Sequence, residues 1–209
     1  MPSPILLLAL GPLSVIVFLL LEQSRKTSKK TPFKRLRVFL VIALLGLAVT
    51  TYANSHLLNP LVIIFSPLEI MSVSNIGIPL YLNMGLSFLL IDLCQYWVHR
   101  LHHKISYLWR LHRLHHSDQD VDALTTFLHH PIEYLTTFLF SIILFILFDI
   151  PMIVLVLYSI IFSVHAAFSH TTLKINPTFE NYLGYVIVTP SIHRLHHALA
   201  FKESNSNFG

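Results

Sequence analysis

The chain has 209 residues, of which 54% are hydrophobic and only 11% are charged. An average soluble domain carries about 25% charged residues, so the composition excludes an ordinary soluble domain and indicates an integral membrane protein. The single cysteine, Cys94, excludes an internal disulfide and any paired-cysteine zinc or redox motif. The formal charge of +4 is not a nucleic-acid signal, because half of the Lys and Arg residues lie in one segment, 25–37, beside apolar runs.

Long apolar runs in the first half of the chain predict membrane spans. Residues 5–21 are expected to be a retained anchor rather than a cleaved signal peptide, because the basic residues follow the run instead of preceding it. Residues 38–58 and 76–98 are predicted to be two further spans. Prolines interrupt the segment 59–75, which we expect to be interfacial or re-entrant.

In the second half, the apolar run is interrupted at Asp149-Ile150-Pro151, which predicts a helical hairpin (134–148 and 151–168) that enters the membrane and returns. All fourteen Lys and Arg residues then fall on one side of the membrane, and such a charge bias marks the cytoplasmic side. We predict an all-α integral membrane helical bundle, in which residues 1–75 form an N-terminal anchor region and residues 76–209 a second domain.

The sequence HRLHH occurs three times, at residues 99–103, 112–116 and 193–197. Residues three or four apart lie on the same face of a helix, so each box presents its histidines together. The predicted topology places all three boxes on the cytoplasmic face, where eight imidazoles can enclose more than one metal ion. Imidazole binds zinc, copper, iron and nickel, so the pattern predicts a metal site without identifying the metal.

Carboxylates near the boxes are candidates for orienting the imidazole ligands. Asp92 lies two turns before the first box within an apolar span, where a carboxylate usually has a functional partner. Glu133 lies three residues after His130. A further acidic group follows the second box, with a solvated loop as the alternative interpretation: Asp118, Asp120 and Asp122.

These features resemble the fatty acid hydroxylase and sterol desaturase superfamily of integral membrane oxygenases, most closely its bacterial members. The resemblance runs from about residue 80 to the end, and box order, box spacing and the hairpin all agree with it. The family continues beyond the final NFG stretch, so a chain ending at Gly209 is expected to be truncated or a short form. The motifs that carry the resemblance are Asp92 through Trp97, His99-Arg100, HxxHHS at 112–117, His130-Pro131 with Glu133, His165, Thr189-Pro190 before the third box, and NSNFG at 205–209.

The resemblance implies a non-haem di-iron centre that uses O₂ to hydroxylate or desaturate a lipid, such as a sterol or a fatty acyl chain. Asp92 and Glu133 would orient the ligands, and His130 is a further candidate for that role. Three other histidines, His102, His129 and His170, have no firm family counterpart and are expected to be structural or solvent-facing. The implied metal ligands are His99, His103, His112, His115, His116, His165, His193, His196 and His197.

The resemblance also implies that residues 76–209 form a catalytic domain and that the protein is located in a bacterial inner membrane. It implies two partners, a membrane lipid as substrate and a cytoplasmic electron donor. An acidic donor could dock on the basic residues around the boxes, although such residues usually serve topology and lipid headgroups. These basic residues are Arg100, Lys104, Arg110, Arg113 and Arg194.

Three alternatives are weighed against this interpretation. The first is a catalytically inactive relative that keeps the fold and the metal. The second is a membrane metal transporter, which would place histidines and carboxylates near the midplane of the bilayer, where only Asp92 approaches. The third is a membrane haem protein, which needs axial histidines deep in facing spans, and the predicted spans have none there.

Overall fold

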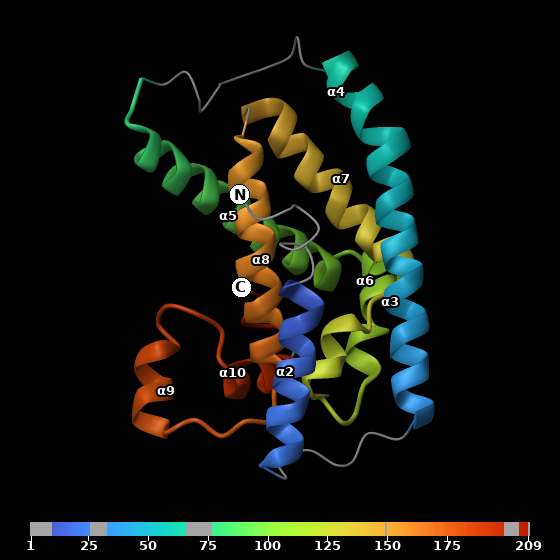
Figure 1. The fold of residues 1–209 in the computed structure, drawn as a ribbon, viewed down its shortest axis with the longest axis vertical. Coiled ribbons are helices and arrows are strands. Elements are labelled where there is room, and N and C mark those ends of the chain that lie inside the picture. The colour runs from blue at the N-terminus through green and yellow to red at the C-terminus, as the bar shows by residue number, and fades with distance from the viewer. Residues whose placement is uncertain (1–9, 26–32, 66–76, 149, 199–204, 209) are drawn as a thin grey trace.

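The computed structural model describes residues 10–25, 33–65, 77–148, 150–198 and 205–208. These residues form helices joined by irregular segments and contain no β-strand, which confirms the predicted all-α class (Figure 1). In chain order the elements are α2 (Leu10–Ser24), α3 (Phe33–Ala53), η1 (Asn54–Leu58), α4 (Asn59–Phe65), α5 (Leu80–Lys104), α6 (Ser106–His112), η4 (His115–Ser117), η5 (Ala123–Phe127), α7 (Pro131–Phe148), α8 (Met152–Ser169), α9 (Pro177–Leu183) and α10 (Pro190–His196).

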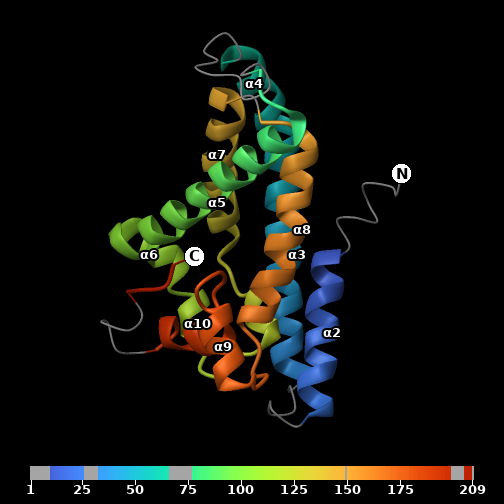
Figure 2. The same ribbon diagram turned by 90° about the vertical axis from the view of Figure 1, so that its left-hand side faces the viewer.

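The helices α2, α3 and α8 run along the long axis of the molecule, and α5 crosses them obliquely (Figures 1 and 2). α2 packs against α8 and α3 packs against α7, while α5 contacts both α7 and α8. Pro151 precedes α8, where the chain reverses after α7, so the predicted helical hairpin is confirmed. Pro190 is the first residue of α10, the helix that leads into the third box.

Two helical segments, Lys34–Leu57 and Met152–Ser169, are long and apolar enough to cross a membrane. α2 and the segment Pro131–Leu144 are apolar but shorter. α5 is not among the crossing candidates, because its C-terminal half carries Asp92 and the first box. The additional spans therefore stay predictions, and parts of two of them, residues 5–9 and 76, lie outside the described residues.

The surfaces of α2 and α3 support the membrane character of the chain. Leu20, Leu44 and Leu47 are each 62% to 65% exposed, and many of their aliphatic neighbours are exposed as well. Monomeric soluble proteins rarely expose large contiguous apolar surfaces.

The interior combines small apolar clusters with many buried polar groups. One apolar cluster joins α2, α3, η5 and α8, and a second joins α5 and α8. Buried polar groups are stable only when they are hydrogen-bonded or bind an ion. The interior is thus organised by specific polar contacts as well as by hydrophobic burial. The polar or titratable side chains among the most deeply buried are Glu22, His102, Asp122, Thr125, Thr171, Thr189 and His196.

One face of α5 explains the role of His102. The buried residues of α5 are four or seven positions apart, as expected for a single helical face, and His102 ends this stripe. Its Nδ1 lies 2.8 Å from the Val98 carbonyl oxygen and its Nε2 lies 3.0 Å from Thr136 Oγ1. With both ring nitrogens engaged, His102 is a structural residue, as the sequence predicts.

Gly46 marks a close approach between α3 and α7. A Cβ atom at this position would overlap the aromatic ring of Tyr134. Tyr134 follows Glu133 in the first turn of α7, and its ring centroid lies 5.7 Å from that of His129. The packing of α3 therefore sets the position of the helix end that carries Glu133.

We expect Gly46→Ala to lower the thermal midpoint of the purified protein in detergent micelles by several degrees, because overpacking costs about 1–3 kcal/mol. Gly85→Ala is the matched control: it lies on α5 with open space around its Cβ position. Ala favours a helix over Gly, so this control should be neutral or stabilising. Equal midpoints for the two variants would contradict the close approach.

Candidate metal centre

The three histidine boxes lie at helix ends that meet in one half of the molecule (Figure 1). The last two turns of α5 carry the first box. The second box begins at the end of α6 and continues through the short helix η4. The third box occupies α10, whose first turn is held by Pro190 and by the Thr189 hydroxyl, which accepts a hydrogen bond from the Ile192 amide at 3.5 Å.

Within the part of the chain that the structure describes, two groups made of histidines alone hold their candidate ligand atoms within 4.8 Å of one another, and a third group joins His112 and His129 to Glu133. Boxes two and three contribute to both groups, so the two groups are adjacent: the rings of His116 and His197, one from each, stack with centroids 4.5 Å apart. Cluster A consists of His99, His103, His112, His116 and His196. Cluster B consists of His115, His170, His193 and His197.

The tautomers of two cluster A histidines follow from their hydrogen bonds. His99 Nδ1 lies 2.7 Å from the Phe208 carbonyl oxygen, and His196 Nδ1 lies 2.7 Å from the Ser206 carbonyl oxygen. A carbonyl oxygen only accepts, so both Nδ1 atoms must carry the proton. In a neutral imidazole the Nε2 atom is then bare, and the two bare Nε2 atoms lie 3.1 Å apart. Two lone pairs at this distance repel each other unless a cation lies between them.

Other ring nitrogens in the two clusters also support metal binding. In cluster A, Nε2 of His103, His112 and His116 is buried and has no hydrogen-bond partner among the described residues, and the same holds for both ring nitrogens of His197 in cluster B. His170 Nε2 lies 2.9 Å from His193 Nε2 in cluster B. Nitrogens bound to one metal at about 2.1 Å and at right angles to each other lie about 3 Å apart. The donor sets of both clusters therefore fit metal ions.

Burial keeps these imidazoles in the form that binds metal. Together with the neighbouring imidazoles, it lowers the pKa of His103 to about 2. Burial also lowers the pKa of His170 to about 3 and that of His196 to about 4, although each imidazole donates a hydrogen bond to a backbone carbonyl, which opposes the shift. The pKa of His99, His115 and His193 falls well below its ordinary value for the same reason. Neutral imidazole is the ligand form, so the clusters are ready to bind metal at neutral pH.

Glu133 lies beside cluster A, at the position where the sequence suggests an orienting carboxylate. Its Oε1 atom accepts hydrogen bonds from His112 Nδ1 at 2.7 Å and from His129 Nδ1 at 2.9 Å. The contact leaves His112 Nε2 bare and aims it into the cluster, as carboxylates commonly do for metal-binding histidines. His129, expected to be structural or solvent-facing, stacks on the cluster B residue His115 with ring centroids 4.2 Å apart.

Two aromatic side chains and the described C-terminal segment cover cluster A. Phe208 and Trp109 lie against His103, with ring centroids 5.0 Å and 5.2 Å away. Asn207 adopts a positive φ of 57°, a left-handed conformation that Asn tolerates. Asn207 lies between Ser206 and Phe208, whose carbonyl oxygens accept hydrogen bonds from Nδ1 of His196 and Nδ1 of His99. Residues 205–208 therefore belong to the site.

The structure does not bring His165 into either cluster, and it brings His170 instead. His165 and His170 are five residues apart, which places them about 140° apart around the axis of α8. His165 Nε2 lies 2.9 Å from the Val188 carbonyl oxygen, whereas His170 faces His115 and His193. The sequence offered no direct signal for this exchange, because it depends on where α8 ends.

Asp92 and His130 also lie outside the two clusters. Asp92 accepts a hydrogen bond from the Tyr158 hydroxyl at 3.1 Å and is exposed. It lies seven residues before His99, about 10 Å along the helix, which explains its separation from the ligands. His130 Nδ1 accepts a hydrogen bond from the Ile132 amide in its own turn at 3.2 Å.

Fold and site together define an all-helical, apolar protein with two adjacent imidazole clusters suited to a pair of metal ions. The sequence model of the family described as "Fatty acid hydroxylase" matches residues 84–209. The chain belongs to this family, and the resemblance noted from the boxes is confirmed. No solved structure matches the chain.

Curated relatives match between 53% and 63% of the chain. Alkylglycerol monooxygenase of Xenopus tropicalis is 31% identical over 116 residues, which are 54% of this chain and 24% of that protein. The human alkylglycerol monooxygenase is 28% identical over 115 residues, 53% of this chain and 24% of that protein. An ornithine lipid hydroxylase of Rhizobium tropici is 27% identical over 131 residues, 63% of this chain and 39% of that protein. The matches thus span between a quarter and two fifths of these relatives.

Lowering the pH should destabilise the metal-free protein. Histidines in the unfolded chain have a pKa of about 6.5 and take up protons below it, whereas the buried ones stay neutral until the pH nears their lowered values, about 4 for His196. The unfolded state then binds more protons, so stability is full above pH 6.5 and is lost as the pH falls toward 4. The measurement is the thermal midpoint in detergent micelles at stepped pH, and a constant midpoint between pH 7 and 5 would contradict buried neutral histidines.

Proposed function

We propose that the protein is an O₂-dependent lipid hydroxylase that holds one iron ion in cluster A and one in cluster B. The observation that carries this proposal is the pair of bare, buried Nε2 atoms of His99 and His196, 3.1 Å apart, whose protons are fixed on the opposite ring nitrogens. Only a cation reconciles these two acceptors. The nine imidazoles of the two clusters are neutral donors, and Glu133 is the carboxylate grouped with them.

The choice of iron rests on the reaction of the relatives. Imidazole clusters bind several metals, but zinc has no redox chemistry. The family is that of the fatty acid hydroxylases, and the similar proteins are a monooxygenase and a lipid hydroxylase. Bound iron would supply the redox chemistry that activates O₂. Hydroxylation is favoured over desaturation, because the names of the curated relatives describe oxygen insertion.

The side chains of the protein hold, orient and shield the site. The cluster histidines bind through bare nitrogens. Glu133 fixes the tautomer of His112, and the carbonyl oxygens of Phe208 and Ser206 fix those of His99 and His196. Phe208 and Trp109 exclude water from cluster A. The reaction converts a lipid C–H bond to C–OH, delivers the second oxygen atom to water, and consumes two electrons and two protons from an external donor.

The lipid and the electrons would reach the site from different sides. The exposed aliphatic surfaces of α2 and α3 support a location in the membrane with access to lipid chains. We place the clusters at the cytoplasmic face of a bacterial inner membrane, because the basic residues gather at that end. Three exposed cations, Lys104, Arg110 and Arg113, are available to an acidic electron donor.

Metal content is the first test. The purified protein should contain two iron ions per chain. His103→Ala, which alters cluster A alone, and His170→Ala, which alters cluster B alone, should each lose one. His165→Ala is the control and should keep both. Loss of metal from the His165 variant with retention in the His170 variant would refute the assignment of the clusters.

Product formation is the second test. Cells that express the protein should accumulate a lipid heavier by one oxygen atom, and growth under isotopically labelled O₂ should place the label in that lipid. The His103→Ala variant should form none of it. The measurement is comparative lipid mass spectrometry. A product lighter by two hydrogens would instead identify a desaturase, and the absence of any oxidised lipid would contradict both reactions.

A further inference from the structure

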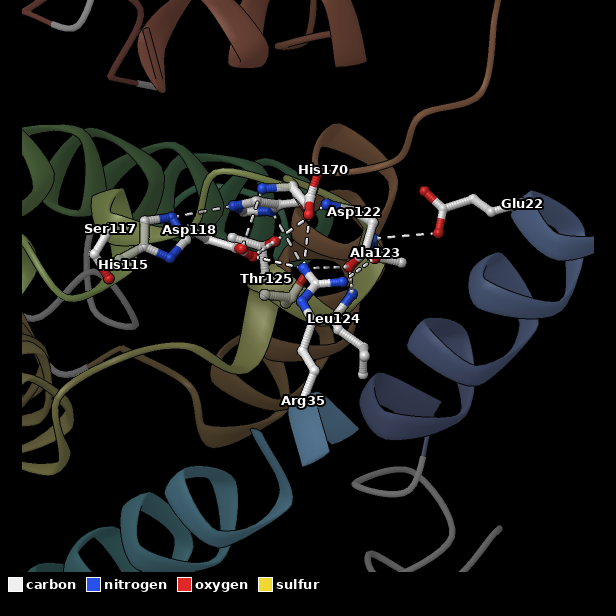
Figure 3. Close-up of polar contacts among 12 residues, drawn as sticks. Glu22, Arg35, His115, Ser117, Asp118, Asp122, Ala123, Leu124, Thr125 and His170 are labelled. Atoms are coloured by element: carbon white, nitrogen blue, oxygen red, sulfur yellow. Dashed lines mark hydrogen bonds and ion pairs between the residues drawn. The ribbon is translucent and has the colours of Figure 1, made fainter. Parts of the chain in front are cut away.

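Helices α2 and α3 precede the family-matched region, yet each sends one charged side chain to the loops that carry cluster B (Figure 3). The two side chains are Glu22, from the last turn of α2, and Arg35, from the first turn of α3. Composition alone gives Arg35 a topology role, because it is one of seven cations between residues 25 and 37. Its contacts in the structure are far more specific than that role requires.

Arg35 makes a three-point contact with the loop that follows the second box. Its guanidinium donates to the carboxylates of Asp118 and Asp122, forming ion pairs with both, and to the Asp120 carbonyl oxygen at 2.6 Å. The side chains of Asp118 and Asp122 are only 9% and 1% exposed. Buried charges of this kind require a paired and hydrogen-bonded partner. The loop conformation therefore depends on Arg35.

Hydrogen bonds at the start of η5 hold the two ends of the same loop together. Asp122 accepts from the Leu124 amide at 3.0 Å, and the Asp122 amide donates to Thr125 Oγ1 at 3.1 Å, which completes a capping box. The Thr125 hydroxyl in turn donates to Asp118 at 2.5 Å. Asp118 lies three residues after His115 of cluster B. Arg35 thus fixes the segment that leads directly out of a candidate ligand.

Glu22 joins this loop to the segment that follows His170. Its side chain is fully buried, and one oxygen accepts from the Thr172 amide at 2.6 Å and from the Thr172 hydroxyl at 3.1 Å. The other oxygen accepts from the Ala123 amide at 3.4 Å. Thr172 lies two residues after His170, so one carboxylate of α2 ties together the two loops that carry His115 and His170.

The third segment that contributes to cluster B, α10, is hydrogen-bonded to the residue that precedes Thr172. Arg194, the residue after His193 in the third box, donates to the Thr171 carbonyl oxygen at 2.7 Å. The described contacts that orient cluster A have a different origin, because Glu133, Ser206 and Phe208 all lie within the family-matched region. The polar contacts of α2 and α3 therefore reach the loops of cluster B, whereas cluster A depends on these helices through the packing of α3 against Tyr134.

We infer that Glu22 and Arg35 are positioning residues for the metal ion of cluster B, supplied by the two helices that precede the family-matched region. This inference rests on the proposed metal binding. Loss of either side chain should release the loops beside His115 and His170 and weaken the metal of cluster B, while cluster A keeps its own. Partners that orient metal ligands typically change affinity by about 10–100-fold when mutated.

The test is a Co²⁺ titration of the metal-free full-length protein in detergent micelles, read by calorimetry and by the visible absorption of bound Co²⁺. Wild type should bind two equivalents. Arg35→Ala should retain one equivalent at wild-type affinity and weaken the other about tenfold or more. Glu22→Gln should act similarly, because its amide group would face a backbone N–H where the carboxylate accepts. The matched controls are Lys34→Ala and Gln23→Ala, exposed neighbours on the same two helices.

Combining the variants assigns the effect to one cluster. In a His103→Ala background, where cluster B binds alone, Arg35→Ala should weaken the remaining equivalent about tenfold or more. In a His170→Ala background, where cluster A binds alone, it should have no effect. Arg35→Lys keeps the charge but not the three-point contact, so it should show a smaller loss and covers the case in which Arg35→Ala does not fold.

The outcomes separate this inference from the proposed function. Absence of Co²⁺ binding to wild type would overturn the metal centre itself. Two unchanged equivalents in Arg35→Ala and Glu22→Gln would overturn the positioning role alone. Equal weakening in the His103 and His170 backgrounds would overturn it as well, because the two helices would then stabilise the whole fold rather than cluster B.

Discussion

Two backbone carbonyls, those of Ser206 and Phe208, decide what cluster A can do. By holding protons on His196 and His99 Nδ1, they leave two bare nitrogens facing each other at 3.1 Å inside a buried space. Protonation does not relieve this conflict near neutral pH, because burial lowers the pKa of both imidazoles. A metal ion does relieve it, and the candidate ligand atoms of His103, His112 and His116 lie within 4.8 Å of these two nitrogens.

The surrounding architecture follows from the need to hold so many polar groups together in an apolar protein. The long helices provide a scaffold, and the ligands lie at their ends or on short helices between them. Boxes two and three divide their histidines between the clusters, so the same two chain segments contribute ligands to both sites. The deeply buried polar side chains behind the clusters form a second layer of contacts that holds these helix ends in place.

Features with a local cause could be predicted from the sequence. Helical spacing predicts that each box presents its histidines together. The break before Pro151 predicts the α7–α8 hairpin, and Thr189 and Pro190 indicate the start of α10. Features that depend on long-range packing could not. The end point of α8 rather than any motif brings His170 to cluster B and turns His165 away, and Arg35 is indistinguishable by sequence from the six cations around it. The sequence predicts that Asp92 orients the metal ligands, but in the structure its carboxylate is hydrogen-bonded to the Tyr158 hydroxyl instead.

The most direct measurement of the central claim is the position of the metal itself. Anomalous X-ray scattering or cryo-electron microscopy of the purified, iron-loaded protein would locate each ion relative to the histidines. We expect two peaks, one enclosed by cluster A with His99 and His196 as ligands, and one enclosed by cluster B with His170 as a ligand. A single peak, or a peak bound by His165 with His170 turned away, would contradict the two-cluster arrangement.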